Sequence, residues 1–357
     1  MIATHGRSFY ILEDISPLRQ LTPAVTSEEA HLYRPATAAR NVSPGHIDYY
    51  LSKVAEKVTI DILDSKGQVV RSFTGTANDV AGGRGGRGGG TGAGGGEPGA
   101  APEGGGGGAE GFGGGRGGRG APNPPDKAGL NRFTWDLRYS GAKPFTGMVL
   151  WGGSTQGPLA VPGTYQVRLT ANGKTLTERF EVEKDPRLDS VTMADLAEQF
   201  TLAMKVRDAV TQANEIVILI RELKKQLDDR LKSNQDAALK AALDGFREKL
   251  RVVEEDVYQV RNRSNQDPLN FPIKLNNKIA ALGSSIERGD GKPTAGSYEV
   301  YKLLAERLAA EQTKLDGTLK ADLPAVNRML VERKLKELVP TTAETPEPKP
   351  AAAAPGN

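Results

Sequence analysis

The chain has 357 residues, of which 38% are hydrophobic and 25% charged, a composition typical of soluble globular proteins with about two domains. Its 47 basic and 44 acidic residues leave a formal charge of +3, so no strong field points to nucleic acid or an anionic membrane. The lack of cysteine excludes disulfides, thiolate metal sites and a cysteine nucleophile, but it fits the cytoplasm and the periplasm equally. Since no signal peptide and no stretch of about 18 apolar residues is present, we expect a soluble chain that does not contact a membrane.

The first twelve residues have the pattern of the end of a β-sheet. Residues 2–4 and 9–12 are short apolar runs with β propensity, and Gly6 lies in the turn between them. Strands without further neighbours present unpaired edges, so this segment should fray or pair with another chain. The candidate partner-docking edge consists of Ile2, Thr4, Phe9 and Ile11.

Residues 47–75 alternate apolar and polar side chains, which predicts a β-hairpin with one buried face. The first strand contains Val58, Ile60 and Ile62, and the second follows a turn at 64–67 with Val69, Val70 and Phe73. The next part, 82–120, holds more than half of the 43 glycines and a single aromatic residue, Phe112. Such a segment cannot offset its backbone entropy by apolar burial, so we expect it to be a disordered insertion.

Alternation returns after Gly129, which predicts the second part of the same small antiparallel sandwich of about five to seven strands. The expected strands carry Phe133, Trp135 and Leu137, then Tyr165, Val167 and Leu169, and finally Leu176, Phe180 and Val182. The dipeptide Asn172-Gly173 is a strong hairpin signal between the last two.

From Asp185 onward the apolar period changes from 2 to 3.6, which predicts a bundle of four to five helices. A long helix capped by Asp189 or Thr192 should form an antiparallel, coiled-coil-like hairpin with a second helix after Ser233. The second helix has its apolar stripe at Leu239, Leu243, Phe246, Leu250, Val253, Val257 and Val260. A third helix is expected around 275–286, a fourth from Pro293-Thr294, and a last short one opening at Pro324.

The sequence offers no catalytic, cofactor-binding or metal-binding site. The three histidines, His5, His31 and His46, lack the spacing of a helical metal pair, and no nucleophile elbow or phosphate-binding loop occurs. The neighbouring carboxylates Glu254-Glu255 and Asp228-Asp229 are most simply solvated helix faces that form i, i+4 pairs.

The string RGGRG occurs twice, beginning at Arg84 and Arg116, and arginines on a glycine chain can contact phosphates and stack on bases. With only four such arginines, no interleaved aromatics and no folded RNA-binding module, we favour a linker over RNA binding.

Several strings together resemble the region that ends and follows the propeller in bacterial BNR-repeat, sortilin-like β-propeller proteins known as glycosyl hydrolases. They are ATHGRSFYILEDISPLRQL at 3–21, AHLYRP at 30–35, AGLNRFTWDLRYSG at 128–141, GPLAVPGTYQVRLTANG at 157–173, KDPR at 184–187 and LNFPIKLNNKIAAL at 269–282. The resemblance covers nearly the whole ordered chain but includes no propeller blade, where carbohydrate-hydrolysing carboxylates would lie. It implies a periplasmic or secreted parent protein.

The middle part also resembles the FlgD-type immunoglobulin-like (Ig-like) domain. The markers are Trp135, Asp136, Pro162, Gly163 and Tyr165. In that family the tryptophan is core, the aspartate helps to fix a turn, and the glycine permits a bend before the tyrosine strand. These residues mark a fold and imply no activity.

We therefore expect an α+β multidomain chain, with a small antiparallel Ig-like β-sandwich, a disordered Gly-rich insertion and an α-helical bundle. The expected parts are a propeller remnant (1–25), two sandwich segments (26–80 and 128–186), the insertion (81–127), the bundle (187–338) and a disordered tail (339–357).

The expected function is that of a non-catalytic accessory module that packs on a β-propeller domain or chain and can form a homo-oligomer through its helices. Partner contacts are expected at the N-terminal edge and, as a second candidate, along the stripe of the 239–260 helix, although such a stripe in a bundle is more often internal core. The alternatives are a part of a glycosyl hydrolase whose catalytic residues lie outside this chain, and RNA binding through the RGG strings.

Overall fold

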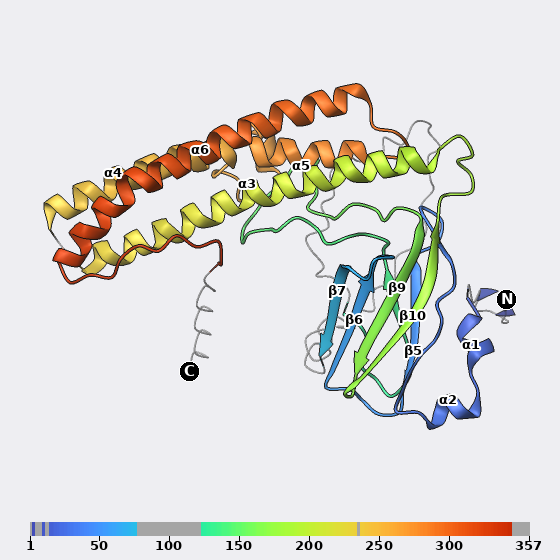
Figure 1. Cartoon of the computed structure of the whole chain (residues 1–357). Coiled ribbons are helices and arrows are strands. Elements are labelled where there is room, and N and C mark those ends of the chain that lie inside the picture. The colour runs from blue at the N-terminus through green and yellow to red at the C-terminus, as the bar shows by residue number, and fades with distance from the viewer. Residues whose placement is uncertain (1, 4–8, 11–13, 77–122, 234–235, 345–357) are drawn as a thin grey trace, which may run out of the picture. The chain divides into compact units, whose positions relative to one another are not determined.

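A computed structural model of the chain describes residues 2–3, 9–10, 14–76, 123–233 and 236–344 (Figure 1). The chain forms two compact units. The first comprises Met1–Ser140 and Leu159–Met193, and the second Gly141–Pro158 and Ala194–Asn357. The first unit contains all the described strands and the second all the long helices, which agrees with the predicted α+β class.

Eight strands of the first unit form two sheets. The five-stranded sheet has the order β4 (Ala38–Ala39), β10 (Lys174–Glu183), β9 (Gly163–Ala171), β6 (Lys57–Leu63) and β7 (Val69–Thr76). The three-stranded sheet has the order β3 (Ala30–Leu32), β5 (Gly45–Leu51) and β8 (Gly129–Trp135). All pairings within these sheets are antiparallel except that of β4 with β10.

Both predicted hairpins are confirmed. Strands β6 and β7 pair across the turn at 64–67, with a register shift between Ile62 and Leu63. Strands β9 and β10 are joined by Asn172 (φ +52°) and Gly173 (φ +76°), the left-handed conformation that a two-residue hairpin turn requires.

The core of the first unit draws side chains from both sheets into one hydrophobic cluster. Trp135 is fully buried there, with its ring 5.5 Å from that of Tyr165 and 6.0 Å from that of Phe180. The predicted strand through Leu137 is too long, since β8 ends at Trp135 and Leu137 has a φ of +58°. Burial of Leu137 and the hydrogen bond from Ala160 N to Leu137 O (2.7 Å) hold this unusual conformation.

The insertion leaves the first unit after β7, and the described chain resumes at Asn123, earlier than the predicted boundary at 127. A Cβ added to Gly75 would overlap the carbonyl oxygen of Pro124, so the outgoing and returning chain are in contact. Ala55 N also donates to Asp126 O (2.9 Å), which fixes the returning segment to the β5–β6 loop.

The second unit is built on four long helices (Figure 1): α3 (Met193–Ser233), α4 (Ala237–Val257), α5 (Leu275–Ile286) and α6 (Ala295–Glu332). A short 3-10 helix, η1 (Asp267–Leu269), precedes α5. Side chains cap two of the helices: Asp236 accepts from Leu239 N, and Thr294 accepts from Ser297 N. The predicted starts of the second and fourth helices are therefore confirmed.

The expected helix start at Pro324 is wrong, because α6 continues through this residue. A proline within a helix costs about 3 kcal/mol. Val326 and Leu330, which follow Pro324 in the same helix, are buried in the helical core and offset this cost.

The apolar stripe of α4 was expected to contact a partner, but it is buried in the unit's own core. Its members Leu239, Leu243, Phe246, Leu250, Val253 and Val257 lie in one cluster with side chains of α3, α5 and α6.

Residues 141–158 were expected in the sandwich, but they belong to the helical unit. Phe145 inserts between helices, 4.9 Å from the ring of Tyr258, and Val149 N donates to the Tyr258 hydroxyl (3.0 Å). Asn214 Nδ2 donates to Lys143 O (2.7 Å). We call this segment the clasp loop; it carries no strand, and several of its backbone groups bond to side chains of the helical unit instead.

Candidate functional site

The predicted docking edge falls at the N-terminus. Ile2 lies in β1 (Ile2–Ala3) and Phe9 in β2 (Phe9–Tyr10), and these strands pair antiparallel with Ala3 opposite Phe9. Thr4 and Ile11 lie outside the described residues. Among the strands that the structure describes, β1 and β2 pair only with each other.

Two short helices follow this hairpin, α1 (Ser16–Gln20) and α2 (Pro23–Ser27). Each has a proline in its first turn, where the missing N–H costs nothing. Asp14 Oδ1 accepts from Ser16 N (2.8 Å) before α1, and Thr22 caps α2. The Gln20 side chain connects α1 to the irregular segment after β3, since it accepts from Arg34 N (2.9 Å) and donates to Arg34 O (3.0 Å).

An apolar pocket of about 230 Å³ lies against these helices. It is lined by Pro17, Leu18, Leu21, Thr26, Tyr33, Tyr50 and Leu130. Leu18 and Leu130 are 53% and 54% exposed, which is unusual for two large apolar side chains at one pocket. We call this set the N-terminal apolar pocket.

Charged and polar groups frame the same pocket. Arg132, two residues after Leu130, donates to both carboxylate oxygens of Asp48 (2.7 and 3.0 Å) and lies 3.9 Å from Asp14. Burial opposes ionisation of Asp14, but its hydrogen bonds from Ser16 and the charge of Arg132 hold the pKa of that carboxyl below its usual value. The Tyr33 hydroxyl is buried without a hydrogen-bond partner in the described part of the chain, and burial raises its pKa.

Sequence reasoning missed this pocket, although Leu130 carried a signal. Phe133 and Trp135 alternate on the buried face of β8, which places the even-numbered Leu130 on the opposite face.

The five fold markers all lie in the first unit. Trp135 Nε1 donates to Arg138 O (2.9 Å), and Asp136 accepts from Arg138 N (3.1 Å) in the turn after β8. Pro162 precedes β9, whose first residue, Gly163, has a φ of +152°. Tyr165 donates to Val161 O (2.8 Å), and burial strongly raises the pKa of its hydroxyl.

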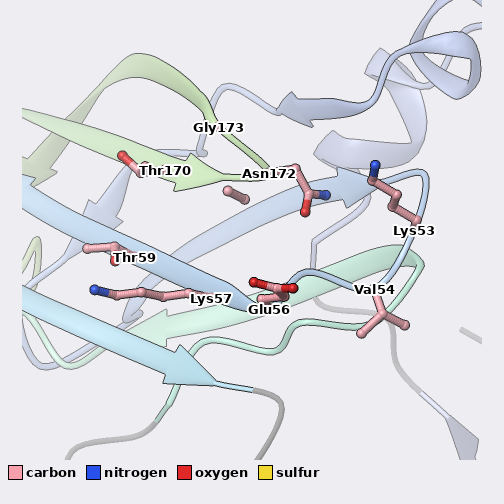
Figure 2. Close-up of a pocket in the computed structure, with 9 residues that line it drawn as sticks. Lys53, Val54, Glu56, Lys57, Thr59, Thr170, Asn172 and Gly173 are labelled. Atoms are coloured by element: carbon pink, nitrogen blue, oxygen red, sulfur yellow. The ribbon is translucent and has the colours of Figure 1, made fainter.

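A second pocket, about 550 Å³ in volume, lies on the five-stranded sheet (Figure 2). It is lined by Lys53, Val54, Glu56, Lys57, Thr59, Thr170, Ala171, Asn172 and Gly173, which come from the β5–β6 loop, β6, and the β9–β10 hairpin. We call it the sheet-face pocket.

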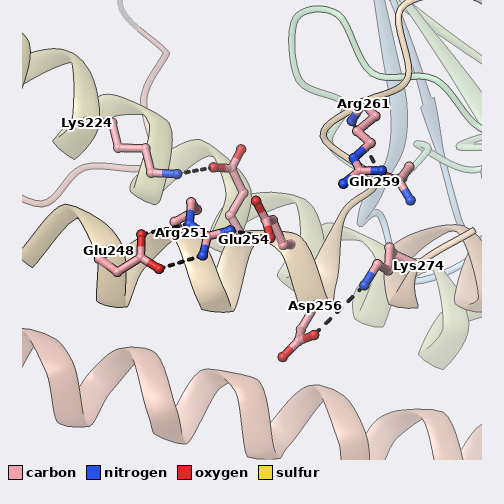
Figure 3. Close-up of polar contacts among 9 residues, drawn as sticks. Lys224, Glu248, Arg251, Glu254, Asp256, Gln259, Arg261 and Lys274 are labelled. Carbon is pink, nitrogen blue, oxygen red and sulfur yellow. Dashed lines mark hydrogen bonds and ion pairs between the residues drawn. The ribbon is translucent and has the colours of Figure 1, made fainter. Parts of the chain in front are cut away.

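The acidic pairs of the helical unit differ from the solvated faces that were expected. Glu255 does form an i, i+4 pair with Arg251 (2.6 Å). Glu254 instead is buried and accepts from Arg221 (2.8 Å) and Lys224 (2.6 Å), as the contact to Lys224 in Figure 3 shows. This carboxylate of α4 pairs with two cations of α3 and so links the two helices.

Asp228 and the histidines likewise have structural partners. Asp228 accepts from Arg247 of α4. His31 lies 3.0 Å from a Glu28 oxygen and His46 3.3 Å from the Thr134 hydroxyl, whereas His5 lies outside the described residues.

No group of three or more His, Cys, Asp or Glu side chains with metal-binding geometry occurs within 14–76, 123–233 and 236–344. Of the helices that the structure describes, none combines the length and apolarity needed to cross a membrane. The RGG strings lie outside the described residues.

Comparison with known proteins yields little. The chain matches no family model, and no curated protein matches it. One similar solved structure is that of CopC from Methylosinus trichosporium OB3b, at a TM-score of 0.19 and 14% sequence identity, covering 43% of this chain and 94% of that chain.

Proposed function

We propose that this chain is a non-catalytic accessory module that packs on a β-propeller of the BNR-repeat, sortilin-like type. The observation that carries the proposal is the N-terminal apolar pocket. Leu18, Leu21 and Leu130 expose apolar surface there, and such surface gains free energy when a partner covers it.

The position of the pocket in the chain supports the same partner. Its helix α1 lies at the end of the segment 3–21, which resembles the last propeller strand and the exit from the propeller, and α2 follows that segment directly. Pairing with this segment therefore brings a propeller close to Leu18 and Leu21. The surrounding groups Asp14, Asp48 and Arg132 supply a polar rim, as protein interfaces commonly have.

We further propose that the first unit is an Ig-like β-sandwich of the FlgD type. Two mostly antiparallel sheets around one hydrophobic cluster, with a buried tryptophan between them, support this assignment. In this proposal the sandwich presents the N-terminal apolar pocket, and the helical unit braces the assembly or joins two copies of it.

The experiment measures binding of the full chain to a purified BNR-repeat propeller whose own C-terminal region has been removed. We expect wild-type binding, and a loss of at least about tenfold in the double variant Leu18→Glu/Leu130→Glu, because each buried carboxylate would lack a partner. Val69→Glu is the matched control, since Val69 is 52% exposed on the edge strand β7 and does not line the pocket.

The proposal fails if the wild-type chain does not bind the propeller, or if the double variant binds as the wild type does. Turnover of a β-glucan or xyloglucan oligosaccharide by the isolated chain would contradict the non-catalytic role.

A further inference from the structure

The sheet-face pocket has a floor of hydroxyl groups. Thr59 of β6 lies directly opposite Thr170 of β9, and the Thr170 hydroxyl is 3.2 Å from that of Thr175 on β10. Two loops form the walls, as Figure 2 shows: the β5–β6 loop with Lys53 and Glu56, and the hairpin with Asn172. Two segments far apart in the sequence, 53–59 and 170–173, thus converge on one concave surface.

Within the described part of the chain, the charged side chains at this pocket lack the ion pairs that neighbouring charged side chains form. In the next cross-strand pair on the same face of the sheet, Arg168 donates to Asp61 at 2.7 and 3.1 Å. Lys53, Lys57 and Glu56, in contrast, form no ion pair with any residue that the structure describes. Two cations and one anion leave the pocket with a net positive charge, which favours an anionic ligand.

Asn172 adds an unsatisfied donor. The hairpin turn holds its backbone at a φ of +52°, and the side-chain amide points from the hairpin toward the loop that carries Glu56 (Figure 2). The Nδ2 atom is buried and has no acceptor among the described residues. A buried donor without a partner is costly, so an acceptor from a ligand stabilises this conformation.

We propose that the sheet-face pocket binds an acidic peptide segment from a partner protein. The ammonium groups of Lys53 and Lys57 lie at opposite ends of the pocket (Figure 2), so each pairs with a different carboxylate of the segment, and the Asn172 amide donates a hydrogen bond to the ligand. The pocket volume of about 550 Å³ exceeds what one carboxylate fills, and exposed Val54 on the rim offers an apolar contact to the rest of the peptide.

The test uses fluorescence anisotropy with the full chain and a fluorescein-labelled peptide of alternating alanine and glutamate, at low ionic strength so that screening is weak. The control peptide has glutamine in place of glutamate. We expect binding of the glutamate peptide alone, and a decrease in affinity of about tenfold in Lys53→Met/Lys57→Met.

Asn172→Gly separates recognition from folding, because glycine adopts the required positive φ while the amide is removed. We expect this variant to keep the wild-type unfolding transition and to bind the peptide about two- to tenfold more weakly. Lys66→Met is the matched control, since Lys66 is an exposed lysine in the β6–β7 turn outside the pocket.

Equal binding of the two peptides, or unchanged binding in the double lysine variant, would overturn the proposal. Citrate tests a free organic acid as the alternative source of the carboxylate. Displacement of the peptide only by a large excess of citrate supports the peptide ligand, whereas displacement at the concentration of the peptide itself would contradict it.

Discussion

The side chain of Asn277 on α5 and the backbone of Trp151 in the clasp loop form a reciprocal pair. Asn277 Oδ1 accepts from Trp151 N and its Nδ2 donates to Trp151 O, both at 2.7 Å, across 126 positions of sequence. Asn277 is buried, so it replaces a backbone partner that the irregular loop cannot find in a strand or helix.

Asn277→Ala removes both hydrogen bonds and leaves a backbone donor and acceptor without partners. We expect the free energy of unfolding to fall by about 2–4 kcal/mol in urea denaturation. Asn277→Asp can still accept from Trp151 N, but it places a buried carboxylate oxygen against Trp151 O and should lose at least as much. Lys278→Ala, at an exposed neighbouring position, serves as the control; a loss as large in this variant would refute the role of the pair.

A substitution of Glu254 on α4 tests the ion pairs that this residue forms with Arg221 and Lys224 on α3. Glu254→Ala leaves Arg221 and Lys224 without their carboxylate, and we expect a loss of about 2–3 kcal/mol. This is less than for a fully buried ion pair, because both cations remain partly exposed. Glu248→Ala on the same helix removes an exposed partner of Arg251 (Figure 3) and should leave the free energy of unfolding close to that of the wild type. Similar effects of the two substitutions would contradict the role of the Glu254 ion pairs.

Gly245 offers a site for stabilisation within α4. An added Cβ meets nothing within 4 Å, so Gly245→Ala should raise the free energy of unfolding by about 0.5–1 kcal/mol through the lower entropy of the unfolded chain. Gly153→Ala is the opposite case, because its Cβ would lie 2.8 Å from Ala280 Cβ and 2.9 Å from Ala281 N. We expect it to lower the thermal midpoint, and a neutral result would show that the clasp loop is not held against α5.

The interaction of Asp185 with Arg187 predicts that the free energy of unfolding falls at acid pH. Hydrogen bonds from the Arg187 side chain and backbone lower the pKa of Asp185 from 3.8 to about 2. Between pH of about 4 and about 2 the unfolded chain therefore binds more protons than the folded chain. The stabilisation from the ionised Asp185 is complete above pH of about 4 and is lost as pH falls through about 2. Urea midpoints of wild type and Asp185→Asn should converge across this window. The exposed Asp189→Asn serves as the control, and curves that stay parallel for Asp185→Asn would contradict the prediction.

The contact of Gly75 with Pro124 predicts that the insertion is dispensable for folding. Replacement of residues 77–122 by a short Gly/Ser link should preserve the fold. The free energy of unfolding should rise by up to about 2 kcal/mol, since each doubling of loop length costs about 0.6 kcal/mol. Loss of the cooperative unfolding transition would instead mean that the insertion contributes to the first unit.

The regular elements of this protein could be predicted because their patterns are local. The turn at Asn172-Gly173 and the helix starts after Ser233 and at Pro293-Thr294 each depend on a few adjacent residues. The stripe of α4 was placed correctly on one face, but sequence could not distinguish an internal core from a partner surface.

The features that sequence missed depend on tertiary contacts. Pro324 continues α6 because residues beyond it are buried, and Leu137 adopts a positive φ because the core encloses it. The N-terminal apolar pocket needs Leu18 and Leu130 to meet from positions more than a hundred residues apart, and no periodicity reveals such a meeting.

The clasp loop has a consequence for the response of the chain to proteases. Because residues 141–158 belong to the helical unit, the polypeptide passes between the units at three places. A single cut in the segment 188–192, before α3, would therefore yield two fragments that remain together, with Phe145 and Trp151 of the N-terminal fragment held among the helices of the other. They would separate on a denaturing gel but co-elute under native conditions, so the nicked protein would act as a heterodimer of its own halves.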